Sequence, residues 1–311
     1  MTPKIRQYLG FLIAGVLLWF LIKPFTETNT DLKNVALLVQ WQWLVLSFGA
    51  LLLYRGFYTV PFTSLLNGIT REKASFLDTF TLFHLSNITR YLPGRIWGVV
   101  RLLSLSPRFG LSRTAVGSSL TLHVGIETAL GGLIATSLLF SDRMRKAATI
   151  GLETFLGKPT LLLAIVVIVI FTGFLFCIPK LTAHAQQLLK TLTPLLENWT
   201  LWVDVITSHS LLWICQGTAF FLFVRSFAHL QWTEVGMLTA CFAFAWLVGF
   251  LSFLTPGGLG IREGLLGMLL AAHIPPAQAT LVALLCRLWM LTVEIVLAGA
   301  AFLLHRHCRV K

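Results

Sequence analysis

Charged residues are scarce in this sequence, and acidic ones are the scarcest. Only 12% of its 311 residues are Asp, Glu, Lys or Arg, with 12 acidic residues against 24 basic ones. An average soluble domain carries about 25% charged residues, whereas 56% of this chain is hydrophobic. Apolar runs long enough to span a bilayer recur along it. The composition therefore excludes an ordinary soluble domain and predicts a polytopic helical membrane protein.

The sequence also lacks the motifs of enzymes, metal sites and disulfide frameworks. Its five cysteines are scattered, without the paired spacing that a disulfide framework or a zinc site needs. It contains no HExxH motif, no GxSxG motif and no acidic cluster for a divalent metal. His123 and Glu127 share one helix face at positions i and i+4, but no third ligand stands near them. We therefore expect no catalytic activity, no metal and no cofactor.

The net charge of +12 is spread over short basic clusters that lie between apolar runs. Such clusters mark the cytoplasmic side of membrane proteins, so we expect no nucleic-acid partner. The densest are residues 142–146 and the tail after Leu304, and both are predicted to face the cytoplasm. Lys4 and Arg6 precede the first apolar segment and place the N-terminus on the same side. The expected location is the plasma (inner) membrane.

One apolar stretch is interrupted by the sequence LTPGGLGIREG at positions 254–264. A proline and several glycines cannot continue a regular helix. Backbone groups freed inside a bilayer must be satisfied by protein or by water in a cavity. Arg262 and Glu263 are costly at this depth unless they are paired or hydrated. A broken helix with buried charge predicts a binding site near mid-membrane.

A second interruption, YLPGRIWG at positions 91–98, repeats this pattern earlier in the chain. Pro93 and Pro256 lie 163 positions apart, counted as 256 − 93. Downstream of each break an apolar helix carries one glutamate, Glu127 and Glu294, and these lie 167 positions apart, counted as 294 − 127. Two such correspondences, in the same order along the chain, predict an internal duplication, which is common in transporters.

These patterns predict an all-α fold, a single integral membrane domain over residues 1–311 with about eight crossings and two broken or re-entrant helices. Its parts are the half-repeats 43–140 and 211–304, separated by an interfacial amphipathic helix at 180–199. Arg55 lies near the far end of a span predicted at about 43–62. We expect its side chain to extend toward the membrane interface.

The broken helices carry the chemistry of an anion site. The first N–H groups of a half-helix have no intrahelical partner and attract anions. Arg95 and Arg262 follow the two breaks and add guanidinium groups suited to phosphate. Glu127, Glu263 and Glu294 would balance these arginines in the empty site, or bind an ammonium group or a proton. The alternative is that all these charges form structural ion pairs that close the bundle.

Several of these residues together resemble a known family. Asn87, the sequence YLPGRIW at 91–97, the sequence PGGLGIRE at 256–263 and Arg287 in the last helix are similar to the flippase-like membrane domain family. This family includes the membrane domain of lysyl-phosphatidylglycerol synthases and stand-alone relatives. The resemblance spans nearly the whole chain and implies an all-helical fold with re-entrant helices that moves lipid, or lipid-linked sugar, between leaflets. Lipid aminoacylation is not implied, because no soluble synthase domain accompanies these segments.

The predicted function is a flippase for an anionic phospholipid or a polyprenyl-phosphate-linked sugar, with the phosphate bound at the Pro-Gly breaks. The alternatives are an intramembrane enzyme acting on a lipid head group and a non-transporting partner of a glycosyltransferase or lipid synthase. A homo-oligomer is compatible with each of these functions. The candidate substrate-binding residues are Asn87, Arg90, Pro93, Gly94, Arg95, Pro256, Gly257, Gly258, Gly260, Arg262, Glu263 and Arg287, with Glu127 and Glu294 as charge-balancing or coupling residues.

Overall fold

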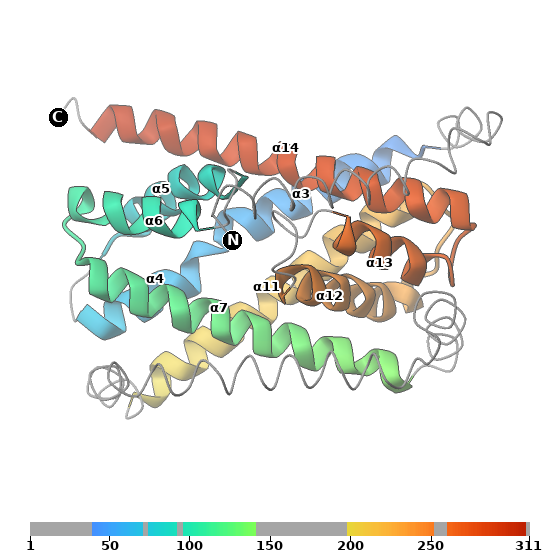
Figure 1. Ribbon diagram of the computed structural model, residues 1–311, viewed down its shortest axis with the longest axis horizontal. Coiled ribbons are helices and arrows are strands. Elements are labelled where there is room, and N and C mark those ends of the chain that lie inside the picture. Colours follow the sequence, from blue (N-terminus) through green and yellow to red (C-terminus); the bar gives the residue numbers. More distant parts are fainter. Residues whose placement is uncertain (1–38, 71–73, 92–95, 141–197, 252–259, 309–311) are drawn as a thin grey trace, which may run out of the picture.

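The computed structural model describes residues 39–70, 74–91, 96–140, 198–251 and 260–308, and every regular element in these ranges is a helix (Figure 1). The predicted all-α fold is confirmed. Four helices or helix pairs are long and apolar enough to cross a membrane: Trp41–Thr70, Trp199–Arg225, Trp232–Leu251 and Pro276–Arg306. The total of eight crossings stays a prediction, because large parts of the chain lie outside the described ranges.

The first described span consists of two helices, α3 (Trp41–Phe57) and α4 (Thr59–Thr70). Pro61 stands in the first turn of α4 and has no N–H to donate to the carbonyl of Phe57, so the helix is interrupted there. Tyr58 between them keeps right-handed helical angles, with φ −56° and ψ −27°. The apolar segment therefore continues to Thr70, beyond the end predicted from the sequence.

Two short helices follow, α5 (Phe76–Asn87) and α6 (Trp97–Leu105), with the 3-10 turn η1 (Ile88–Tyr91) after α5. Their 12 and 9 residues correspond to about 18 and 14 Å. Both are shorter than the hydrocarbon core of a bilayer, which is about 30 Å thick. They pack against each other, so the chain turns back on itself where the sequence predicts the first break.

After the turn η2 (Ser106–Phe109), the long helix α7 (Arg113–Thr136) starts at a defined cap. The Ser112 hydroxyl accepts a hydrogen bond from the N–H of Ala115 at 3.1 Å, which satisfies one of the free donors of the first turn. The turn η3 (Ser137–Phe140) ends this segment, at the position where the first predicted half-repeat ends.

The second half of the described chain contains four further helices and one turn. They are α11 (Trp199–Arg225), η4 (Trp232–Glu234), α12 (Val235–Leu251), α13 (Ile261–Leu270) and α14 (Pro276–Cys308). Residues 271–275 form the turn between α13 and α14, and Pro276 opens α14 at a position where a proline costs no hydrogen bond. The amphipathic helix predicted at 180–199 lies almost entirely outside the described residues.

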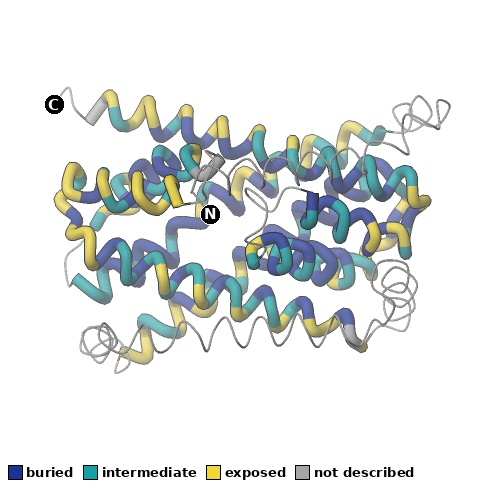
Figure 2. The backbone as a smooth tube through the Cα atoms, in the orientation of Figure 1, coloured by how far each residue is buried: buried dark blue, intermediate teal, exposed yellow. Residues whose placement is uncertain are grey.

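The interior is built where α11 packs along α3 and α12, and exposed residues lie along the outer sides of the helices (Figure 2). Gly217 on α11 allows α12 to approach closely, because a Cβ atom there would overlap the side chain of Thr239. On the outside, Leu133 and Leu303 expose 68% and 63% of their surface. Large apolar side chains exposed along several helices fit a surface that faces lipid.

The two short-helix elements lie along different parts of α14 (Figure 1). α5 and α6 lie beside its C-terminal part, and the ring of Phe109, just after α6, is 5.6 Å from the ring of His305. α13 lies beside its N-terminal part, where Gly267 packs close to the backbone of Thr280. The long helix α14 therefore packs against both short-helix elements.

The direction of α7 bears on the predicted topology. α7 begins near the C-terminal end of α14, and its 24 residues, about 36 Å, lead to the other end of the bundle. There Leu138 packs in one cluster with Leu269 at the end of α13. Residues 142–146 themselves lie outside the described ranges, but they follow from this end. That residues 142–146 and the C-terminal tail both face the cytoplasm stays a prediction, because residues 141–197 and 309–311 lie outside the described part of the chain.

Candidate functional site

A group of charged side chains lies in the middle of the apolar helices. We call it the charged centre, and it consists of Arg55, Glu127, Arg262, Glu263, Arg287 and Glu294. Five of the six are buried, and only Arg287 is partly exposed. Arg55 stands near the midpoint of the 30-residue segment Trp41–Thr70, and Glu294 near the midpoint of the 33-residue α14. Charges at such a depth in apolar helices are expensive and typically functional.

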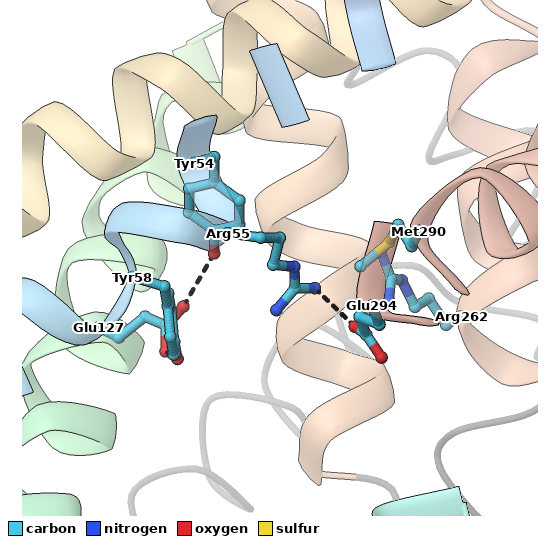
Figure 3. A network of polar contacts seen from close by, with 7 residues as sticks. All are labelled: Tyr54, Arg55, Tyr58, Glu127, Arg262, Met290 and Glu294. Atoms are coloured by element: carbon cyan, nitrogen blue, oxygen red, sulfur yellow. Dashed lines mark hydrogen bonds and ion pairs between the residues drawn. The ribbon is translucent and has the colours of Figure 1, made fainter. Parts of the chain in front are cut away.

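Arg55 forms a buried ion pair across the bundle (Figure 3). Its Nη2 atom lies 3.2 Å from Oε1 of Glu294, and its guanidinium lies over the rings of Tyr54 and Tyr58, 5.3 and 5.9 Å from their centroids. The expectation that Arg55 extends to the membrane interface is therefore wrong. The apolar segment continues through α4, which leaves Arg55 too far from either end to reach the interface.

Glu127 on α7 accepts hydrogen bonds from two tyrosines, Tyr54 on α3 and Tyr58 at the junction of α3 and α4. The hydroxyl of Tyr54 donates to Oε1 at 3.3 Å, and the hydroxyl of Tyr58 donates to Oε2 (Figure 3). Both tyrosines reach the same carboxylate because residues four apart share one helix face. His123, one turn before Glu127, contacts His209 on α11 at 3.1 Å between ring nitrogens. The two residues of the predicted HxxxE pair thus have different partners.

The N-terminus of α13 is capped by the carboxylate of Glu263 in its first turn. Gly260 precedes the helix with a φ of +84°, a conformation that favours glycine, and its N–H donates to Oε2 of Glu263 at 2.8 Å. The other oxygen of Glu263 lies 3.5 Å from Nη1 of Arg287. The sequence prediction required N–H groups at this helix start that are open to an anion. The N–H of Gly260 is not open, because it donates to Glu263. Glu263 thus pairs with Arg287 and not with Arg262, the neighbouring arginine that it was predicted to balance.

Arg262 has a different environment from the other two arginines. Its Nη2 atom lies 3.1 Å from the sulfur of Met290, and its guanidinium lies 4.9 Å from the ring centroid of Phe242. No carboxylate of the described residues forms an ion pair with it. A thioether is a weak acceptor and an aromatic ring a modest one, so this buried cation is poorly compensated.

The stem of Arg262 passes directly over the backbone of α12 at Gly249. A Cβ atom at Gly249 would lie only 2.9 Å from the Cβ of Arg262. Any larger residue would push the arginine away from α12. The glycine therefore positions the guanidinium.

A small cavity of about 10 Å³ lies inside the charged centre. This is close to the space that one water molecule needs. Phe242 and Met290, which contact Arg262, form part of its wall, so the cavity and Arg262 are neighbours. The lining residues are Tyr54, Arg55, Glu127, Trp213, Gln216, Phe242, Trp246 and Met290.

The structure thus brings Glu127, Arg262, Glu263, Arg287 and Glu294 together, while Asn87 lies half-buried at the end of α5. Two residues of the site, Arg55 and Gln216, are missing from the sequence prediction. The side chain of Arg90 and residues Pro93, Gly94, Arg95, Pro256, Gly257 and Gly258 lie outside the described part of the chain.

Long apolar helices around a buried charged centre define an integral membrane protein with a polar site at mid-depth. The profile of the family described as "Lysylphosphatidylglycerol synthase TM region" matches residues 7–299, and the chain belongs to this family. The resemblance inferred from the sequence is confirmed. A search of curated proteins and a search of solved structures returned no match. Membership fits a role that involves membrane lipids.

Proposed function

We propose that the protein moves a lipid with a phosphate-containing head group between the leaflets of the plasma membrane, and that Arg262 binds the phosphate. The observation that carries this proposal is the environment of Arg262. Arg262 is buried in the first turn of α13, and among the described residues no carboxylate pairs with it. A phosphate would supply the missing counter-charge and two charge-assisted hydrogen bonds.

The neighbouring ion pairs explain why Arg262, and not another arginine, is the candidate. Glu294 lies within ion-pair distance of Arg55, and Glu263 within ion-pair distance of Arg287. A lipid phosphate would have to displace a carboxylate to bind at either of those positions. Anionic phospholipids and polyprenyl-phosphate-linked sugars both carry a suitable group.

The arrangement of the short helices supports a transporter. α5 with α6, and α13, lie beside different parts of α14 and are too short to cross a bilayer alone. We infer that both are re-entrant elements of an inverted repeat. The repeat also relates α3 to α11, which pack together: Arg55 and Gln216 line one cavity and lie 161 positions apart, counted as 216 − 55.

The test is lipid transfer in vesicles of phosphatidylcholine that contain a trace of tail-labelled phosphatidylglycerol. We expect Arg262→Ala to abolish exchange between leaflets, measured by dithionite quenching of the label. Arg262→Lys should restore little, because a point charge does not replace a bidentate guanidinium. Arg306→Ala, which removes an exposed arginine near the end of α14, is the matched control and should transfer lipid at the normal rate.

The same vesicles separate the alternatives. Lipid that is chemically altered, as seen by mass spectrometry, would identify an intramembrane enzyme. Wild-type protein that neither moves nor alters lipid would contradict transport, and would favour a partner of a glycosyltransferase or lipid synthase. An Arg262→Ala protein that fails to insert or fold would assign the arginine a structural role.

A further inference from the structure

We propose that Gln216 and Arg55 form a subsite for a hydroxyl group of the transported head group. This proposal rests on the proposed function and specifies its substrate: a phosphate lipid whose head group carries a hydroxyl close to the phosphate. The site is the small cavity of the charged centre, next to the contacts of Arg262.

Gln216 is the observation from which this inference starts. Its side chain lies in the middle of α11, the residue is 1% exposed, and neither its amide nitrogen nor its amide oxygen has a hydrogen-bond partner among the described residues. The Nε atom of Arg55 is also buried without a hydrogen bond. Both side chains line the same cavity. Buried polar groups without partners are rare in native proteins and call for an explanation.

The open positions define the chemistry of the missing partner. The amide nitrogen of Gln216 and the Nε of Arg55 are donors, and the amide oxygen of Gln216 is an acceptor. A hydroxyl group both accepts and donates hydrogen bonds, so it matches this set. A primary ammonium group only donates, and a quaternary ammonium group does neither. Head groups ending in ethanolamine or choline therefore leave part of the subsite unsatisfied.

The size of the cavity fits one hydroxyl. Its volume of about 10 Å³ holds about one water molecule, and a hydroxyl oxygen has the size of a water oxygen. Trp213, Trp246 and Phe242 form the aromatic part of its wall. A hydroxyl of the head group would take the place of one water.

Two contact residues connect this subsite to the phosphate site. Phe242 and Met290 touch Arg262 and also line the cavity. A phosphate held by Arg262 would therefore place the next atoms of the head group against the cavity wall. Glycerol on a phospholipid and a sugar on a polyprenyl phosphate both carry hydroxyls within a few bonds of phosphorus.

The experiment compares two lipids that differ only in hydroxyl groups. Tail-labelled phosphatidylglycerol and phosphatidylpropanol have the same charge and the same chains, and each is tested in phosphatidylcholine vesicles with the full-length protein. We expect the wild type to transfer phosphatidylglycerol about tenfold faster, because the other lipid leaves buried polar groups unpaired. Gln216→Leu and Gln216→Met should transfer the two lipids at similar rates.

The control is Gln278→Leu, which removes a glutamine that donates to the carbonyl of Phe227 and does not line this cavity. It should keep the tenfold preference. Equal wild-type rates for both lipids, or an unchanged preference in both Gln216 variants, would overturn the subsite while leaving transport itself intact. Absence of any Arg262-dependent transfer would instead refute the proposed function. A labelled short-chain polyprenyl-phosphoglucose, run in parallel, tells by the faster rate whether glycerol or sugar supplies the hydroxyl.

Discussion

Arg55 and Glu294 form an ion pair whose contribution to stability is open to measurement. Removal of one partner leaves the other charge buried, which typically costs about 3–5 kcal/mol. We expect Arg55→Leu and Glu294→Leu each to lower the free energy of unfolding by about this amount, measured by thermal or denaturant unfolding in detergent. In the double variant, the loss should be smaller than the sum of the two single losses by at least about 1 kcal/mol.

The double-mutant cycle also contains its own control. Arg55→Leu combined with Arg306→Ala, at the far end of α14, should show additive losses because the two side chains do not touch. Additive losses for Arg55 and Glu294 themselves, within about 0.5 kcal/mol, would contradict a stabilising pair.

Residue type alone identified part of the charged centre. Glu127, Glu294 and Arg262 stand out because a charge within an apolar segment needs a reason. The prediction that Arg55 extends to the membrane interface was wrong because a side chain reaches the interface only from near the end of a span. The helix α4 continues the span beyond Arg55 and so increases this distance. Gln216 gave no signal, because an uncharged amide in a helix becomes conspicuous only when its surroundings in space are known.

At the scale of elements, the crossing of α12 and α13 depends on Gly249. A methyl group there would collide with the Cβ of Arg262, which is fixed to the backbone of α13 and cannot turn aside. We expect Gly249→Ala to displace the guanidinium and to lower lipid transfer by about tenfold or more, since small misplacements of binding groups carry large penalties. The vesicle assay with labelled phosphatidylglycerol measures this.

Gly236→Ala is the matched control, because Gly236 lies on the same helix and a Cβ atom there would meet open space. It should leave transfer unchanged. Equal transfer by the wild type and Gly249→Ala would show that the close packing of Arg262 against α12 does not matter for transport.

Element boundaries were predictable where a local signal exists. Ser112 and Pro276 mark the starts of α7 and α14 by capping and by proline geometry. The second half-repeat was predicted to begin at residue 211, whereas α11 begins at Trp199. Its first turns contain Asp204 and His209, which lower the local hydropathy. His209 is nevertheless buried against His123, a long-range contact that no sequence window contains.

For the whole molecule, the direction of α7 predicts a testable topology. Reporter domains fused after Phe140 and after Lys311 should report opposite sides of the membrane, because α7 and α14 end at opposite ends of the bundle. Alkaline phosphatase, active outside, and green fluorescent protein, fluorescent inside, provide the paired readout. Truncation after Leu251 with the same reporters controls for fusions that fail to insert.

The same side for both reporters would contradict the arrangement of α7 in the bundle. The fold class was predictable at this scale because composition reflects the solvent of the whole chain. The relative direction of helices was not, since basic clusters indicate sides one loop at a time while packing decides the path between them.

The attachment of α14 has a mechanical consequence. Arg287 and Glu294 stand seven residues apart, about 10 Å along the helix axis, and each forms an ion pair with a different element, α13 and α3. A stiff rod held near its middle acts as a lever with a central pivot. If it tilts, one end swings outward while the other swings inward, so the faces beside α5–α6 and beside α13 would widen in turn and not together.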